Sequence, residues 1–144
     1  MGINLDPDEM LEVFGEHDPT RYAQEVEERW GDTDAYQESH RRTSSYTKED
    51  WQRLRAESEA IEAELADCLR AGEPSDGGRA KGAAERHRAH IDDWFYPCSH
   101  DMQAGLAEMY VQDPRFRAHY DDIEAGLAEY VRDAIVANAL DHIP

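Results

Sequence analysis

A single apolar stripe in the middle of the sequence constrains the fold most strongly. Between Thr47 and Gly72, apolar or small side chains recur at alternating spacings of three and four, namely Trp51, Leu54, Ser58, Ile61, Leu65 and Cys68. This period places them on one face of an α-helix of about seven turns. Thr47 and Asp50 resemble a capping box, with Asp in place of the usual Glu or Gln. The pattern predicts a long amphipathic helix that ends at Gly72, with Cys68 as a small buried hydrophobe.

The rest of the chain carries similar helix signals, and no segment alternates between apolar and polar residues as a strand would. Helix starts and stops occur at Asp6-Pro7 with Gly15, at Asp18-Pro19 with Gly31, and at Asp113-Pro114. We expect further helices from Thr33, from about Asp76 into the aromatic triplet at 94–96, and around Met102–Tyr110. A last helix should turn inward the residues Ile123, Leu127, Tyr130, Val131, Ala134 and Ile135. Pro97 should end or kink the helix before it, and 73–78 should form a loop. The sequence therefore predicts an all-α bundle.

The two ends of this bundle differ in expected strength. Residues 1–46 hold 12 acidic against 4 basic residues, a net charge of −8, and their predicted helices are short. Isolated helices below roughly 12–15 residues are marginal in water. We predict a weakly stable N-terminal helical arm over 1–46 and a firm helical core over 47–144, together forming one domain. The arm is too aromatic for a solubilising tail, so its rings should be covered at least part of the time.

The charge of the whole chain limits its partners. Its 33 acidic and 15 basic residues give a net charge of −18. This excess repels phosphate backbones and anionic lipids, so we expect no direct contact with nucleic acid and none with membranes. Two cysteines are too few for a disulfide-dense secreted fold, and no apolar run approaches the roughly 20 residues of a membrane span. The start MGINLDPDEM lacks the features of a signal peptide, which favours a cytoplasmic protein with reduced thiols.

Histidine and cysteine side chains offer a candidate zinc site. His87 and His90 are three residues apart on one helical face, and Cys98 and His100 follow. These residue types suit zinc, but the spacing of Cys98 and His100, with one residue between them, is poor for chelating one ion. No CxxC or HExxH pattern accompanies them. The competing interpretation is a set of partly exposed helix residues beside Asp92 and Asp93, and we favour it. We expect no metal and no cofactor.

A thiol-dependent enzyme is a second candidate. Cys98, His100 and Asp101 contain the residue types of a catalytic triad, although sequence neighbours at a helix start point in different directions. His90 or His119 could supply a distant base. The dipole of a helix N-terminus near Cys98 favours the thiolate, while apolar surroundings oppose it. We expect no catalytic turnover, so the chain is predicted not to be an enzyme.

A ligand cleft is the third candidate. Tyrosine and tryptophan suit a wall that is apolar along its body and hydrogen-bonding at its tip, and methionine adds an adaptable surface. Three consecutive aromatics at 94–96 cannot all face the interior of one helix, whereas Leu106, Phe116 and Tyr130 should be ordinary core. The candidate ligand-binding residues are Trp30, Tyr36, Tyr46, Trp51, His90, Trp94, Tyr96, Cys98, Met102 and Tyr110.

Four long runs of the sequence resemble a known family. They are RWGDTDAYQES (29–39), SYTKEDWQRL (45–54), LAEMYVQDPRF (106–116) and the closing LAEYVRDAIVANALDHIP. These motifs are similar to those of the TipAS-type antibiotic-recognition domain, the C-terminal effector-binding part of MerR-family transcriptional regulators. The resemblance covers essentially the whole chain.

This resemblance implies a globin-like helical fold whose N-terminal helices are loose without ligand and close over it. It also implies thiopeptide antibiotics of the thiostrepton class as ligands. A full-length regulator would add a winged helix-turn-helix and a dimerisation helix. The Met1 start suggests a separately made, antibiotic-sequestering short form or a piece of one, which we expect to be monomeric alone and part of a dimer in a full-length regulator.

One position departs from the family pattern. Family members capture a dehydroalanine of the antibiotic with a cysteine that lies seven residues after the position matching Cys98. Gly105 occupies that place in this sequence. Either Cys98 makes the covalent bond or binding is non-covalent, and we expect non-covalent binding with Cys98 in the wall.

The leading hypothesis is therefore a non-enzymatic domain that binds and sequesters thiopeptide antibiotics in an aromatic cleft. It would give resistance, serve as the effector domain of a MerR-type activator, or do both. The alternatives are a zinc- or thiol-dependent enzyme that uses His87, His90 and Cys98, and a protein-interaction module acting through the acidic arm.

Overall fold

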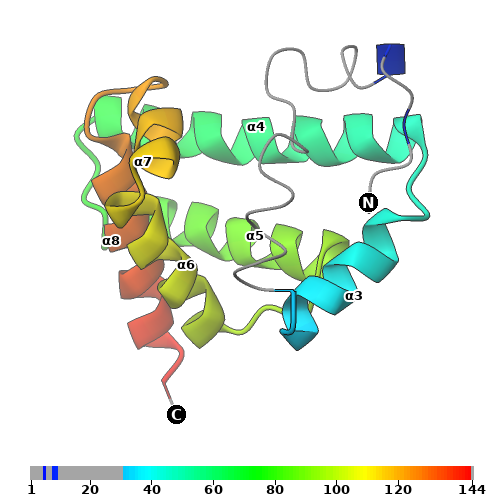
Figure 1. The fold of residues 1–144 in the computed structure, drawn as a ribbon. Helices are drawn as coiled ribbons and strands as arrows, with labels where there is room; N and C mark the ends of the chain where they lie inside the picture. The colour runs from blue at the N-terminus through cyan, green and yellow to red at the C-terminus, as the bar shows by residue number, and fades with distance from the viewer. Residues whose placement is uncertain (1–4, 6–7, 10–30, 144) are drawn as a thin grey trace. The chain divides into compact units, whose positions relative to one another are not determined.

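The computed structural model of the chain describes residues 5, 8–9 and 31–143. Its helices are α3 (Asp34–Thr43), α4 (Lys48–Arg70), α5 (Gly78–Trp94), α6 (His100–Gln112), α7 (Pro114–Asp121) and α8 (Leu127–Asp141) (Figure 1). The described residues contain no strand, and the prediction of an all-α fold is confirmed. The helices expected before Gly31 lie outside the described residues. No helix in the described part is long and apolar enough to cross a bilayer.

The long central helix begins and ends where its sequence signals predict. At the start of α4, the backbone N–H of Thr47 donates to the Asp50 carboxylate at 3.0 Å, and Asp50 N–H donates to the Thr47 hydroxyl at 3.2 Å. This reciprocal pair is a capping box. At the other end Gly72 has φ +73°, and Glu73 N–H donates to the Cys68 carbonyl at 2.9 Å. The positive φ suits glycine, so one residue type fixes where this helix stops.

Side-chain caps also set the starts of three shorter helices. The Thr33 hydroxyl accepts from Tyr36 N–H at 3.1 Å before α3, and the Asp113 carboxylate accepts from Arg115 N–H at 2.9 Å before α7. Both starts agree with the sequence prediction. The cap of α6 is Ser99, which the sequence analysis did not identify.

The last helix begins later than the predicted inward face, which included Ile123. α8 starts at Leu127, after Gly126 with φ +84°, so Ile123 precedes the helix and is only partly buried. The other five residues predicted to face inward are buried.

The chain divides into two compact units. The first unit comprises Met1–Glu57 and Ile91–Pro97, and the second unit comprises Ser58–His90 and Cys98–Pro144. The first turns of α4 and the last residues of α5 thus belong with the N-terminal part of the chain. The division into an arm over 1–46 and a core over 47–144 stays a prediction.

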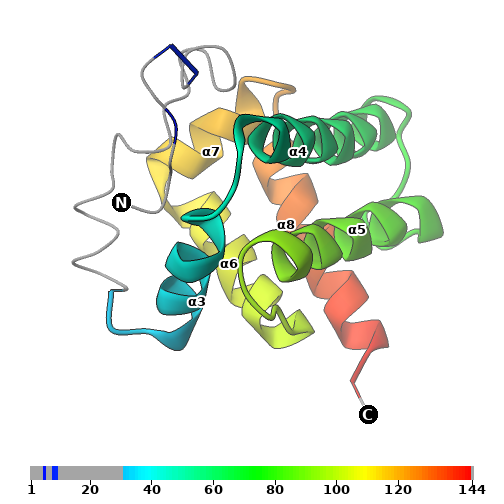
Figure 2. The ribbon, with the colours of Figure 1, turned by 90° about the vertical axis from the view of Figure 1, so that its right-hand side faces the viewer.

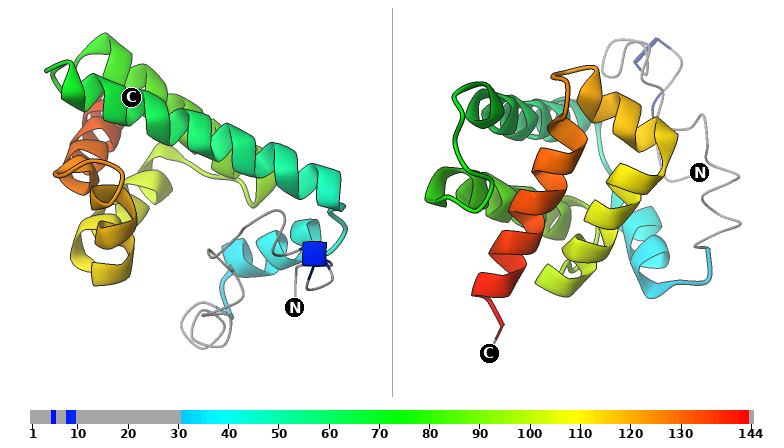
Figure 3. Two further views of the ribbon diagram at one scale, coloured as in Figure 1. Left: turned by 90° about the horizontal axis from the view of Figure 1, so that it is seen from above. Right: turned by 90° about the vertical axis from the view of Figure 1, so that its left-hand side faces the viewer.

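The second unit has a large and mostly aliphatic core. Within it, α4 and α5 run side by side in opposite directions (Figure 2), and α6 packs against α8 in the same way, with α7 against both (Figure 3). Small alanines allow these helices to approach closely, and larger side chains fill the layers between them. The buried residues of this core are Ile61, Leu65, Ala66, Cys68, Ala80, Ala83, Ala84, Ala107, Tyr110, Tyr120, Leu127, Ala128, Tyr130, Val131, Ala134 and Ile135.

Three residues that were predicted to be ordinary core of this unit differ in their burial. Tyr130 is buried, and its hydroxyl donates to the Glu73 carbonyl at 2.8 Å. Leu106 is partly buried against the core. The prediction for Phe116 is wrong, because this residue is 37% exposed. It lies in the first turn of α7, one turn before the buried Tyr120, where the core ends.

Candidate ligand-binding site

Three aromatic rings form the centre of the first unit. The Tyr46 ring meets Trp51 edge to face at 5.5 Å between centroids, and meets Trp94 in the same way at 5.4 Å. Trp51 and Trp94 are only 3% and 9% exposed, and Leu54 is buried with them. Edge-to-face pairs add to the stability that burial of the rings provides. These residues, which we call the aromatic cluster (Tyr46, Trp51, Leu54 and Trp94), are the core of the first unit.

Polar contacts fix the orientation of the rings in the aromatic cluster. The Tyr46 hydroxyl donates to the Trp94 carbonyl, and burial raises the pKa of this phenol. The Trp94 indole N–H donates to Glu57 at 3.0 Å, and the Arg53 guanidinium lies 5.1 Å from the centre of the Trp94 ring. Such a cation over the face of an indole is attracted by the negative π surface. The cluster thus joins the start of α4 to the end of α5.

An ion network on α3 provides a second link within the first unit. Arg41 and Arg42 both pair with Glu38, at 2.6 and 2.7 Å, and their hydrogen bonds lower the pKa of Glu38 to about 2. Arg42 also donates to the Asp92 carbonyl at 2.7 Å. This hydrogen bond connects α3, which carries Tyr36, to the last turn of α5.

The second unit has an aromatic group of its own around Tyr110. Its ring lies 5.9 Å from His87, 5.5 Å from Phe116 and 5.3 Å from Tyr120. Burial, with a smaller electrostatic contribution from His90, lowers the pKa of His87 to about 4. His87 is therefore neutral at pH 7, and its Nδ1 lies 2.9 Å from the side-chain amide of Gln103.

Gln103 is a component of this region that sequence reasoning missed. Its side chain is fully buried in α6, and its Nε2 also donates to the Ala84 carbonyl at 2.8 Å. Because that carbonyl can only accept, the amide orientation is fixed, and Oε1 has no hydrogen-bond partner among the described residues. In the sequence, the only signal for this role is a glutamine between two apolar positions of the predicted helix.

Cys98 is enclosed rather than presented to solvent. It is 2% exposed, its Sγ lies 3.7 Å from the Ser99 carbonyl, and its own carbonyl accepts from Arg88 at 2.7 Å. Ser99 is the N-cap of α6, whose hydroxyl accepts from Met102 N–H at 3.1 Å. The predicted helix start next to Cys98 is present, but the thiol in this arrangement is closed to an incoming electrophile.

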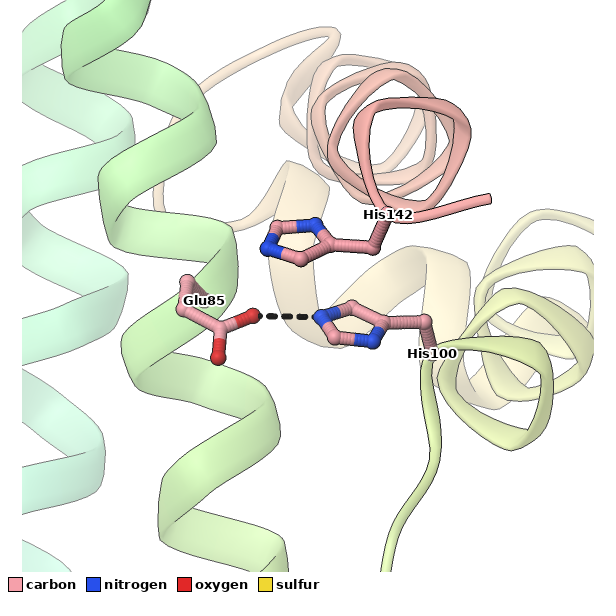
Figure 4. Close-up of side chains that lie close together, drawn as sticks. All are labelled: Glu85, His100 and His142. Atoms are coloured by element: carbon pink, nitrogen blue, oxygen red, sulfur yellow. Dashed lines mark hydrogen bonds and ion pairs between the residues drawn. The ribbon is translucent and has the colours of Figure 1, made fainter. Parts of the chain in front are cut away.

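The residues of the zinc and thiol hypotheses are not brought together. His90 is buried and His87 is desolvated, so the prediction that both are partly exposed is wrong for His90. His100 bonds to Glu85 at 2.8 Å, and His119 bonds to Glu62 at 3.0 Å. Among the described residues, the group of potential metal ligands that does converge is Glu85, His100 and His142 (Figure 4).

The ten candidate ligand-binding residues fall into three groups by exposure. Five are buried, namely Trp51, His90, Trp94, Cys98 and Tyr110. Tyr36, Tyr46 and Tyr96 are half-buried, and Met102 is 39% exposed. Trp30 lies outside the described residues. The side chains that a ligand could touch without rearrangement of a core are therefore the three tyrosines and Met102.

An all-helical fold with half-buried tyrosines and enclosed thiols is compatible with a helical ligand-recognition domain. The model of the TipAS antibiotic-recognition domain matches residues 22–138. The chain belongs to this family, and the resemblance seen in its four sequence runs is confirmed.

Two relatives with known names extend the comparison. The HTH-type transcriptional activator TipA of Streptomyces coelicolor is 51% identical over all 144 residues, which cover 57% of that protein. The HTH-type transcriptional activator mta of Bacillus subtilis is 35% identical over 121 residues, which are 84% of this chain and 46% of that protein. The chain therefore spans about half the length of these activators.

Two solved structures are also similar. TipAS of Streptomyces lividans in complex with nosiheptide superposes with a TM-score of 0.90 at 50% identity, over 99% of each chain. The antibiotic-binding domain of a TipA-class multidrug resistance transcriptional regulator has a TM-score of 0.60 at 44% identity, over 65% of this chain and 100% of the other.

Proposed function

We propose that the chain binds and sequesters thiopeptide antibiotics of the thiostrepton class. The observation that carries this proposal is the 50% identity, over 99% of both chains, to a domain solved in complex with the thiopeptide nosiheptide. Thiopeptides are large and mostly apolar, so aromatic surface provides affinity through burial and stacking. The net charge of −18 is compatible with such a ligand, since it carries little charge of its own.

We propose the ten residues identified from the sequence as the ligand contacts, with different roles. Tyr36, Tyr46 and Tyr96 in the first unit, and Met102 in the second, have solvent-accessible surface that a ligand can contact directly. Trp51 and Trp94 support the Tyr46 ring and reach the ligand only if the aromatic cluster opens. Trp30, His90, Cys98 and Tyr110 complete the proposed set.

Binding is proposed to be non-covalent. Cys98 is 2% exposed, which opposes attack of its thiolate on a dehydroalanine. Intact-mass measurement after incubation with thiostrepton should show no adduct, whereas an adduct that disappears in Cys98→Ser would contradict this part of the proposal.

Gly105 provides a positive control for that measurement. A Cβ built on Gly105 meets no atom within 4 Å, so a cysteine fits there without moving its neighbours. If the resemblance places the family's capturing thiol correctly, Gly105→Cys should convert the protein to covalent capture.

The direct test of the function is a titration with nosiheptide and thiostrepton. All three tryptophans lie in 1–57 or 91–97, so their fluorescence reports on the first unit. A ligand that binds the folded state should also raise the melting temperature with ligand concentration. Absence of both responses at saturating thiopeptide would reject the proposal.

Two matched variants locate the contacts. Replacing the half-buried Tyr96 by Ala should weaken binding by at least about tenfold, since aromatic anchors at interfaces cost more than 1 kcal/mol when truncated. Leu140→Ala is the control, because Leu140 is 63% exposed and outside the proposed contact set. Equal loss in both variants would indicate non-specific hydrophobic binding.

We further propose that residues 1–46 become ordered on binding. Circular dichroism should then show a gain of helix with ligand, and calorimetry a strongly negative heat-capacity change, because coupled folding buries apolar surface. Unchanged helix content at saturation would contradict the ordering without contradicting binding.

In a longer regulator, this domain would act as the effector domain, and ordering by the ligand would bias a DNA-binding dimer. The helix-turn-helix activators among its relatives support this role and a cytoplasmic location. The chain itself is proposed to be monomeric, without enzymatic activity and without direct nucleic-acid contact.

A further inference from the structure

Three side chains in the second unit converge outside the proposed antibiotic site. Glu85 comes from α5, His100 from the first residue of α6, and His142 from the residue after α8. One ligand atom from each lies within 4.8 Å of the other two (Figure 4). The two imidazole rings stack at 4.0 Å between centroids and 10° between planes. Three segments far apart in the sequence thus bring two imidazoles and one carboxylate close together.

Asn138 holds two members of this group in place. Its backbone carbonyl lies 2.8 Å from His142 Nδ1, and its side-chain amide donates to Glu85 Oε1 at 3.0 Å. Because a carbonyl can only accept, His142 carries its proton on Nδ1 and leaves the Nε2 lone pair for another partner. Asn138 is only 4% exposed, so this buried residue orients an otherwise exposed histidine. A second partner that fixes the tautomer of a histidine is typical of metal ligands.

Hydrogen bonds within the protein keep the Glu85 carboxylate ionised. Arg88 pairs with Oε2 at 2.6 Å, and its hydrogen bonds, with further ones from His100 and Asn138, lower the pKa of Glu85 to about 2. His100 Nε2 lies 2.8 Å from Oε1 of the same carboxylate. An ion at this place would take over Oε1 while Arg88 keeps Oε2. The proton that His100 Nε2 shares with Oε1 would then move to Nδ1 or to solvent.

From this geometry we propose that Glu85, His100 and His142 form a binding site for one divalent transition-metal ion, with zinc as the best match. Two imidazoles and one carboxylate are a zinc ligand set, whereas magnesium and calcium require oxygen ligands. Ligand atoms about 2.0–2.1 Å from a tetrahedral zinc lie roughly 3.3 Å apart, so the group would have to contract. Because the lone pair of an imidazole nitrogen lies in the plane of its ring, one of the two stacked rings would also have to rotate towards the ion, and His142 at the exposed end of α8 has room to do so. His142 is exposed, so an ion can enter from solvent. The ion would tie the end of α8 to α5 and α6.

Zinc and cobalt titrations of the 144-residue protein, freed of any affinity tag and of metal by a chelator, test the proposal. One zinc ion per chain should bind and raise the melting temperature, and cobalt should give the intense visible bands of a tetrahedral site. His142→Gln should weaken zinc binding by at least about tenfold, because it removes one of the three proposed ligands. Excess magnesium should not compete.

His119→Gln is the matched control. It also removes one imidazole, but His119 pairs with Glu62 at 3.0 Å, outside the group. The zinc affinity of this variant should equal that of the unchanged protein. Absence of zinc binding, equal affinities of the two variants, or displacement by magnesium would each overturn the proposal, because the last two indicate chelation by scattered surface carboxylates. His142 lies after the last helix, so circular dichroism should show that both variants fold.

Discussion

The two compact units of the chain hold their apolar residues together by different means. Among the described residues, the apolar core of the second unit is a cluster of sixteen buried residues, mostly alanines and aliphatic side chains from α4 to α8. The apolar cluster described in the first unit has three buried members, Trp51, Leu54 and Trp94, with Tyr46, Phe95 and Leu5 packed against them. It depends on ring geometry and on a few hydrogen bonds to keep these rings in place. The difference teaches that stability and adaptability can be assigned to different parts of one small chain, because a small aromatic core loses less when it opens.

The largest effect should come from a cavity in the second unit. Leu65 is 1% exposed, and Leu65→Ala should lower the free energy of unfolding by about 2–5 kcal/mol, since the surrounding helices can relax only partly. Urea unfolding followed by circular dichroism measures this. Leu140→Ala is the control and should stay within about 0.5 kcal/mol of the parent. A similar small change in Leu65→Ala would mean that the second unit is not the more stable one.

A decrease in pH should weaken the second unit next. His87 has a folded-state pKa of about 4 against a usual value of 6.5, so the unfolded state binds a proton that the folded state does not. Stability from this group is complete above pH 6.5 and falls as the pH drops towards 4, by on the order of 1–3 kcal/mol. Urea midpoints at pH 7 and pH 4.5 measure the loss. His87→Gln should make the two midpoints more alike, and an unchanged difference would contradict the assignment.

Removal of one hydroxyl should affect the first unit more modestly. Tyr46→Phe deletes the hydrogen bond to the Trp94 carbonyl and should cost about 1 kcal/mol. The effect should appear in tryptophan fluorescence, and the circular dichroism of the remaining helices should be nearly unchanged. Tyr130→Phe makes the same deletion in the second unit, where the Tyr130 hydroxyl bonds to the Glu73 carbonyl. If both variants change both signals equally, the two units unfold together.

The smallest effect should come from the surface ion network of α3. The pKa of Glu38 is lowered to about 2 by hydrogen bonds from Arg41 and Arg42, so its contribution is present above about pH 4.5 and is lost as the pH falls towards 2. Glu38→Gln should slightly raise the pH at which acid changes the tryptophan fluorescence. Exposed ion pairs contribute little to stability, so the shift in this pH should be small. A large shift would show that Glu38 acts mainly by positioning Arg42 for its hydrogen bond to the Asp92 carbonyl.

Much of the fold could be predicted from the sequence, because its signals are local. The capping box at Thr47 and Asp50, the stop at Gly72 and the burial of Cys68 depend on neighbours within one or two turns. The exposure of Phe116 was missed, because helical periodicity does not tell where a core ends. The convergence of Glu85, His100 and His142 was missed for a different reason. These residues meet only through tertiary packing, and no spacing in the sequence encodes it.

The candidate binding residues show the same limit. Aromatic composition placed Tyr46, Trp51 and Trp94 among the ten candidates, and the structure packs the Tyr46 ring against both tryptophans. Composition could not separate rings that support a wall from rings that face outward, because burial depends on neighbours distant in sequence. The distinction between Trp51 and Tyr96 needed coordinates.

The discontinuity of the first unit has a consequence for synthesis on the ribosome. Trp51 and Leu54 find their partner Trp94 only after some forty further residues have been added, and the Tyr46 hydroxyl waits for the same backbone. Domains generally assemble as their chain emerges, but here the earliest segment is completed by a late one. A nascent polypeptide that has not passed Pro97 therefore cannot bury the Trp51 indole against Trp94 as the finished chain does.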